Sequence, residues 1–221
     1  MSMHLQREIE RLKKHLLSLC ALVEDQVQLA IRALVDRDEG LAREVEQRDA
    51  EVDQREIEVE EDCLKTLALY QPVAMDLRLI VAALKIDNDL ERIGDLAVNI
   101  AHKAAALAVE PAIEMPFDVD GMWNKTQAML RDALNALVNT DVKLAQAVCA
   151  RDDEVDRMKH ETRIKLEGII REHPERTHVL LRLMAVSRNL ERIADCATNI
   201  AEDVVYMVEG RIVRHRAEEQ E

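Results

Sequence analysis

The chain has 221 residues, of which 48% are hydrophobic, so it is long and apolar enough to bury a core as one large domain or two small ones. Only 5 glycines and 4 prolines interrupt it and aromatic residues make up 2%, which excludes a fold of many strands and predicts an all-α protein. The 44 acidic residues outnumber the 30 basic ones. The resulting net charge of −14 repels phosphate backbones, so nucleic acid is not expected as a direct partner.

Three helices are predicted in the first half of the chain. The first runs from about Leu5 to Val35, where apolar residues recur every three or four positions and form one stripe. Residues 37–40 form a turn, and the second helix follows to about Leu69. Pro72 separates the second helix from the third. It can lie in the first turn of the third helix, where its missing N–H group costs nothing.

The second half repeats this plan after a linker-like stretch, VEPAIEMPFDVDG, which carries two prolines and one glycine. Residues 139–141 offer a cap for the second helix of this unit, His173 and Pro174 separate its last two helices, and Gly210 can close the last one. We therefore expect six helices in two tandem three-helix bundles. The expected division is a first bundle over residues 1–108, a linker over 109–120, a second bundle over 121–212 and a polar tail over 213–221.

The two halves are related by an internal repeat. Three stretches recur in the same order: residues 33–35 at 136–138, RDAEVD at 48–53 as RDDEVD at 151–156, and DNDLERIGDLAVNIAHK at 87–103 as SRNLERIADCATNIAED at 187–203. The offset is 103 residues for the first two stretches and 100 for the third. Three matches at nearly one spacing indicate two copies of one three-helix unit.

Each predicted unit places two pairs of carboxylates on facing helices. Asp49 and Asp53 are four residues apart, as are Glu91 and Asp95, and residues four apart share one helix face. An antiparallel hairpin that turns at Pro72 puts Asp49 level with Asp95, and it puts Asp53 level with Glu91. The same reasoning applies about His173-Pro174. We predict a first acidic cluster of Asp49, Asp53, Glu91 and Asp95, and a second acidic cluster of Asp152, Asp156, Glu191 and Asp195.

These acids border the apolar faces of their helices, so each cluster is expected to be partly buried. Four partly buried carboxylates must take up protons or bind cations, because isolated buried charge is very costly. Oxygen-rich sites suit magnesium, manganese or iron, and carboxylates also bind zinc. Asn99 and Asn199 continue the same stripe and could add carbonyl ligands. The alternative is ion pairing with the neighbouring arginines, which are Arg48, Arg92, Arg151 and Arg192.

Other kinds of site find little support. The four cysteines have no CxxC spacing, which argues against a zinc ribbon or a redox motif. The sequence has no Gly-rich phosphate loop, GxSxG elbow or HExxH motif, so we expect no enzyme activity. It has no apolar run that could span a bilayer and no signal peptide pattern. We therefore expect a cytoplasmic protein that reaches a membrane only through its partners.

Two long motifs resemble signatures of a known family. Residues 71–101, QPVAMDLRLIVAALKIDNDLERIGDLAVNIA, and residues 189–210, NLERIADCATNIAEDVVYMVEG, are similar to the two signatures of the PhoU family of bacterial phosphate transport. The acidic pairs match the metal-cluster motifs of that family at the eight positions given above. The second motif differs from the family pattern at two positions. Ala194 corresponds to Gly94, and Cys196 stands where relatives often have histidine, so the softer thiol could change the metal preference there.

The resemblance implies a cytoplasmic, commonly dimeric protein whose two bundles bind iron, zinc or similar metals. It also implies that the protein represses the phosphate-starvation response, acting between the ATPase of the phosphate importer and a phosphate-sensing histidine kinase in the membrane. Two other functions stay open from the residues. The carboxylates could instead serve a metal-storage or metalloenzyme bundle, or the protein could be a helical scaffold without metal.

Overall fold

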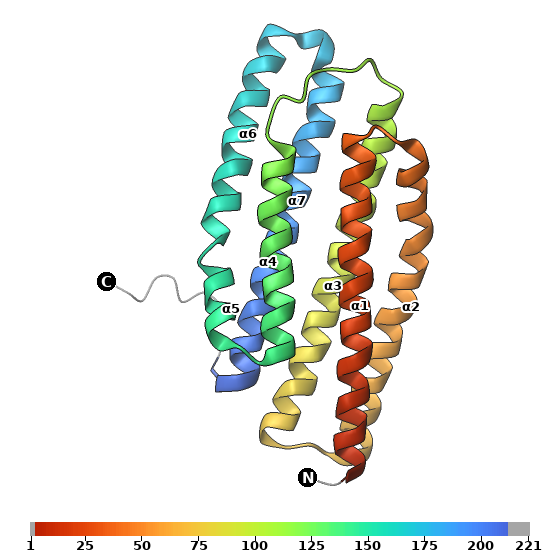
Figure 1. Ribbon diagram of the computed structural model, residues 1–221, viewed down its shortest axis with the longest axis vertical. Helices are drawn as coiled ribbons and strands as arrows, with labels where there is room; N and C mark the ends of the chain where they lie inside the picture. The colour runs from red at the N-terminus through yellow and green to blue at the C-terminus, as the bar shows by residue number, and fades with distance from the viewer. Residues whose placement is uncertain (1–2, 212–221) are drawn as a thin grey trace, which may run out of the picture.

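The computed structural model describes residues 3–211, which form α-helices, one short 3-10 helix and no strand. The first unit contains α1 (Met3–Val35), α2 (Glu39–Tyr70) and α3 (Ala74–Ala108). The second contains α4 (Val119–Asn139), α5 (Val142–Cys149), α6 (Asp152–Glu172), η1 (Pro174–Arg176) and α7 (Thr177–Glu209). Figure 1 shows the two units side by side, with the helices roughly along the long axis. The predicted all-α fold of two three-helix bundles is confirmed; the predicted polar tail lies outside the described residues.

The connection between α2 and α3 corrects one prediction. Pro72 does not lie in the first turn of α3, because α3 begins at Ala74 and is preceded by the extended residue Val73 (φ −130°). Gln71 caps the end of α2 in the left-handed region (φ 45°), and Ala74 also has a positive φ of 51°. These two left-handed residues reverse the chain on either side of Pro72, so the proline belongs to the connection.

The predicted second helix of the second unit is divided in two. Asp141 caps α5 as expected, since its side chain accepts hydrogen bonds from the backbone N–H groups of Lys143 and Leu144. The helix then tightens at residues 150–151 and restarts at Asp152, where three consecutive acids occupy the first turn of α6. Acidic side chains favour a helix N-terminus, and the first repeat has an alanine at the position of Asp153. Gly210 closes α7 with φ 71°, as predicted.

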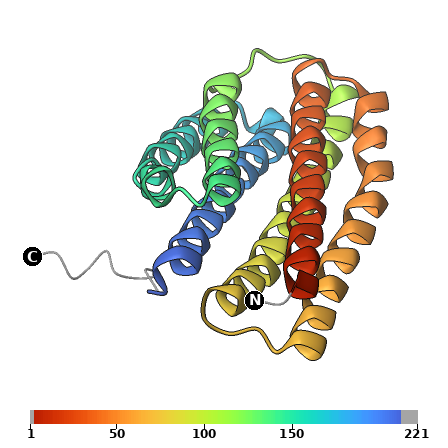
Figure 2. The same cartoon turned by 60° about the horizontal axis from the view of Figure 1, so that its bottom comes forward.

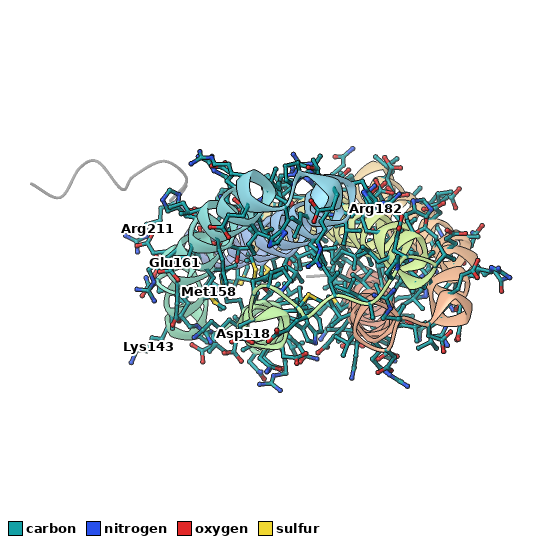
Figure 3. All side chains as sticks on the ribbon, turned by 90° about the horizontal axis from the view of Figure 1, so that it is seen from above. Asp118, Lys143, Met158, Glu161, Arg182 and Arg211 are labelled. Atoms are coloured by element: carbon teal, nitrogen blue, oxygen red, sulfur yellow. The ribbon has the colours of Figure 1, made fainter. Side chains whose placement is uncertain are left out.

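The two units are joined mainly through α3 and α7, which pack against each other along the middle of the molecule (Figures 1 and 2). Lys85 of α3 lies 3.0 Å from a carboxylate oxygen of Asp203, a residue of α7 that is only 2% exposed. At one end, Arg182 of α7 pairs at 2.9 Å with Glu110, which follows α3; Figure 3 looks down on this end. No helix among the described residues has an apolar stretch long enough to cross a membrane.

Candidate metal centre

The four acids of the first acidic cluster lie near one another on two helices. Asp49 and Asp53 lie on α2, Glu91 and Asp95 lie on α3, and the two helices pack against each other. Burial raises the pKa of Glu91, and the negative charges of its neighbours, including the other three acids of the cluster, raise it further. These charges act on one another between α2 and α3.

The backbones of α2 and α3 approach closely at this cluster because α3 has a glycine there. A Cβ atom on Gly94 would lie 3.2 Å from Cγ1 of Val52 and 3.2 Å from Oε1 of Gln26, which is tighter than ordinary van der Waals contact. It would also lie 3.8 Å from Oδ1 of Asp49. Gly94 therefore lets the helix that carries Glu91 and Asp95 sit directly against the helix that carries Asp49.

Gln26 of α1 supports this cluster from inside the core, and the sequence analysis missed it. Its side chain is completely buried, and Nε2 donates hydrogen bonds to Oδ1 of Asp49 at 3.1 Å and to the backbone carbonyl of Val45 at 3.3 Å. Its own Oε1 is buried and has no hydrogen-bond partner. The available signal was a glutamine within the apolar stripe of the first helix, next to Val27.

Asp87 of α3 is a second residue that the sequence analysis missed. It is 1% exposed, and its buried Oδ1 has no hydrogen-bond partner. Burial raises its pKa to about 8, with further contributions from the negative charges of Glu56, Glu60 and Glu91. The signal was its position one helical turn before Glu91, on the same face of α3.

The second acidic cluster is also assembled, but it contains a lysine. Burial raises the pKa of Asp195 to about 6, and the charges of Glu191, Asp152 and Asp156 raise it too, whereas Lys159 lowers it. The Lys159 ammonium lies 2.6 Å from Oε1 of Glu191 and 3.1 Å from Oδ1 of Asp156, so it bridges α6 and α7. The sequence analysis did not assign a role to Lys159, although its place three residues after Asp156 pointed toward the cluster.

The two asparagines that could add ligands differ in their surroundings. Nδ2 of Asn199 donates a hydrogen bond to Oδ1 of Asp89 at 3.2 Å, so this side chain joins α7 to α3. Asn99 is an exposed residue of α3. Cys196 is completely buried, and burial raises the pKa of its thiol to about 12. A thiol in this environment lies in the core and is a poor ligand for an ion at the second cluster.

The alternative to metal binding was ion pairing of the cluster acids with neighbouring arginines, and the structure shows such a pairing with a lysine. Arg48 pairs with Glu44 one turn earlier on α2, and Arg151 pairs with Asp132 of α4 at 2.7 Å. Both arginines therefore point to acids outside the clusters. Within residues 3–211, the ion pairs to cluster carboxylates are those of Lys159 in the second unit, and the equivalent position 103 residues earlier is Glu56.

The donors of the first cluster suit a hard cation in their chemistry. Carboxylate and amide oxygens are the ligands that such ions prefer, and two buried acceptor oxygens, on Gln26 and Asp87, have no partner. Over residues 3–211, no three His, Cys, Asp or Glu side chains already converge on one point that could hold a metal ion. Asp53 and Asp95 are exposed, so their side chains have room to turn toward a common ion.

Comparison with known proteins decides the family. The PhoU domain model matches residues 16–104 and again residues 119–204, one match in each unit. The chain belongs to the PhoU family. It is 39% identical over 209 residues to the "phosphate-specific transport system accessory protein PhoU homolog" of Pseudomonas aeruginosa, covering 94% of this chain and 86% of that protein. It is 37% identical over 214 residues to the homolog of Aquifex aeolicus, covering 97% of each chain.

Solved structures of PhoU proteins share the whole fold. The crystal structure of PhoU from Pseudomonas aeruginosa superposes with a TM-score of 0.91 at 39% identity, over 93% of this chain and 99% of that one. The phosphate transport system regulatory protein PhoU from Streptococcus pneumoniae superposes with a TM-score of 0.86 at 26% identity, over 95% and 99% of the two chains. The arrangement of two tandem bundles is therefore that of the PhoU family.

Proposed function

We propose that this protein is a regulatory adaptor of phosphate transport that represses the phosphate-starvation response. The observation that carries the proposal is the PhoU match in both units, together with relatives named as accessory or regulatory proteins of phosphate transport. Its proposed partners are the ATPase of the phosphate importer and the phosphate-sensing histidine kinase. It would act in the cytoplasm as a homodimer and reach the membrane through these two partners.

Removal of the gene tests the regulatory role directly. Cells that lack the protein should express their phosphate-uptake genes in high phosphate, because the repressing link between importer and kinase is missing. The measurement is reporter expression from such a gene, in deleted and complemented cells. Expression that stays repressed after deletion would contradict the adaptor proposal.

We also propose that the acidic clusters bind metal ions, with iron or zinc as the expected metals and manganese or magnesium as alternatives. In the first unit the ion would be held by Asp49 and Asp53 of α2 and by Glu91 and Asp95 of α3. A bound cation supplies positive charge that offsets the repulsion among these acids. The carboxylates would then tie α2 to α3 and stiffen the surface that partners meet.

Metal analysis of a double variant tests this role. Asp95→Ala combined with Asp195→Ala removes one carboxylate from each cluster and should markedly reduce the metal content of the purified protein. If docking requires the metal, binding to the importer ATPase should weaken in parallel. Glu51→Ala, an exposed acid of α2 outside the cluster, serves as the control and should leave the metal content unchanged. Full metal occupancy in the double variant would refute the assignment.

The carboxylate clusters also motivate a second candidate, a metal-storage or metalloenzyme bundle. It predicts catalytic turnover or mineral uptake when the protein is supplied with iron and oxygen. A protein that binds metal and shows neither would exclude it. A helical scaffold without metal is the third candidate. The stability of such a protein would not change when cations are added.

A further inference from the structure

The two clusters differ at positions that the repeat makes equivalent. The offset of 103 residues pairs Glu56 of α2 with Lys159 of α6, and it pairs Glu60 with Arg163. The first unit thus places two further acids beside its cluster, where the second unit places two bases. The charge of Glu56 acts on Glu91, whereas Lys159 lies 2.6 Å from Glu191.

The buried polar residues of the two units differ as well, and again the first unit has the additional acid. Asp87 of the first unit corresponds to Ser187 of the second, at an offset of 100 residues. Asp87 keeps a buried Oδ1 without a partner, whereas the Ser187 hydroxyl donates a hydrogen bond to the backbone carbonyl of Met184 at 3.1 Å. The charged side chains that act on Asp87 are Glu56, Glu60 and Glu91, and all three are acidic. A buried carboxylate among other carboxylates requires a proton or a cation.

A third pair completes the contrast. Gln26 corresponds to Met129, which is also buried but carries no oxygen. The first unit therefore presents two buried acceptor oxygens that lack donors, on Gln26 and Asp87. Both units also supply hydrogen-bond donors to cluster acids: Gln26 donates to Asp49, and Thr198 donates to Oδ1 of Asp152 at 3.3 Å. A charged donor is seen in the second unit, where Lys159 donates to Asp156 and to Glu191.

We propose that the two clusters have diverged, so that the first unit binds a divalent cation between Asp53 and Glu91, with Asp87 as an additional ligand. In the second unit the Lys159 ammonium takes the place of that cation between Asp156 and Glu191. This inference rests on the metal binding proposed above and confines it to the first unit. The buried oxygen of Asp87 extends the first site toward the core by one helical turn from Glu91. In the second unit an arriving cation would have to displace a lysine that already pairs with both helices, and its charge would be repelled by that lysine.

Exchange of single residues between the two units tests the divergence. The probe is Mn²⁺ alone, added to the full-length protein after treatment with a chelator, and the readouts are stoichiometry and Kd from calorimetry and from the spectrum of free Mn²⁺. Asp87→Ser installs the residue of the second unit and should weaken binding by about 10-fold or more. Lys159→Glu installs the residue of the first unit and should create a second class of binding sites. Circular dichroism checks that both variants remain helical.

Two single variants assign the binding to a unit. Glu91→Ala should abolish the tight Mn²⁺ binding of the wild type, whereas Glu191→Ala should leave it unchanged. The divergence would be overturned if these two variants lost Mn²⁺ binding equally and if Asp87→Ser and Lys159→Glu had no effect on it. That result would still support metal binding by both units. A wild-type protein that binds no Mn²⁺ would overturn the metal proposal itself, and the divergence with it.

Discussion

Replacement of Asp87 by serine should raise the free energy of unfolding of the cation-free protein by about 2–4 kcal/mol at pH 7. The unfolded chain loses the Asp87 proton near pH 3.8, whereas burial raises the pKa in the folded protein to about 8. Between these values folding must bind a proton, so the stability of the wild type falls as the pH rises through this range and levels off above pH 8. The serine variant lacks this slope. Its advantage should be near zero at pH 4 and largest above pH 8.

Urea unfolding at several pH values in the presence of a chelator measures this difference. The reciprocal change, Ser187→Asp, is the matched control and should destabilise the protein more at pH 8 than at pH 4, because it buries a new carboxylate in the second unit. Added Mn²⁺ should favour the wild type over Asp87→Ser, since an ion that binds only the folded state raises its stability. A serine variant that is less stable at every pH would mean that Asp87 has a stabilising partner within the protein.

The opposite signs of these two effects separate a binding role from a structural one. A carboxylate kept for packing would lower stability when removed and would leave cation affinity unchanged. A carboxylate kept for a ligand lowers the stability of the ligand-free protein and raises the affinity for the ligand. Residues of this second kind are expected where a functional site conflicts with the stability of the fold.

The sequence was sufficient to predict both acidic clusters because only local rules were needed. Helical spacing places Asp49 with Asp53 and Glu91 with Asp95, and the turns at Pro72 and at His173-Pro174 set the level of each facing pair. The fold follows from the same information, since apolar stripes and a repeat define three helices in each unit. The position of Pro72 was wrong by a few residues, because left-handed residues such as Gln71 are not evident from sequence.

The sequence could not show which groups surround each cluster from other helices. Gln26 of α1 donates a hydrogen bond to Asp49 of α2. The position of α1 beside α2 depends on how the three helices pack together, and the spacing of residues within each helix does not determine that packing. Asn199 and Cys196 are close to residues of α3, which belongs to the other unit, and a prediction made for an isolated unit could not include these neighbours. The sequence alone assigned no role to Lys159, because its pairing with acids on two helices depends on how α6 and α7 pack.

Replacement of Gly94 by leucine should have the largest destabilising effect, a loss of more than about 3 kcal/mol in the free energy of unfolding. Even a Cβ atom would come within 3.2 Å of Val52 and Gln26, and the rest of a leucine side chain has no space between α2 and α3. The two helices would have to separate, which would also move Asp49 away from the acids of α3. Urea unfolding and Mn²⁺ titration should therefore both report a loss.

Gly168 provides the matched control because it is also a glycine within a helix, but a Cβ atom there would meet nothing within 4 Å. Gly168→Leu should be neutral or stabilising by up to about 1 kcal/mol, since leucine favours a helix more than glycine does. Equal effects of leucine at the two positions would mean that α2 and α3 are not in close contact at Gly94. A large loss at Gly94 alone would show that the first acidic cluster depends on a helix pair that only glycine allows to approach so closely.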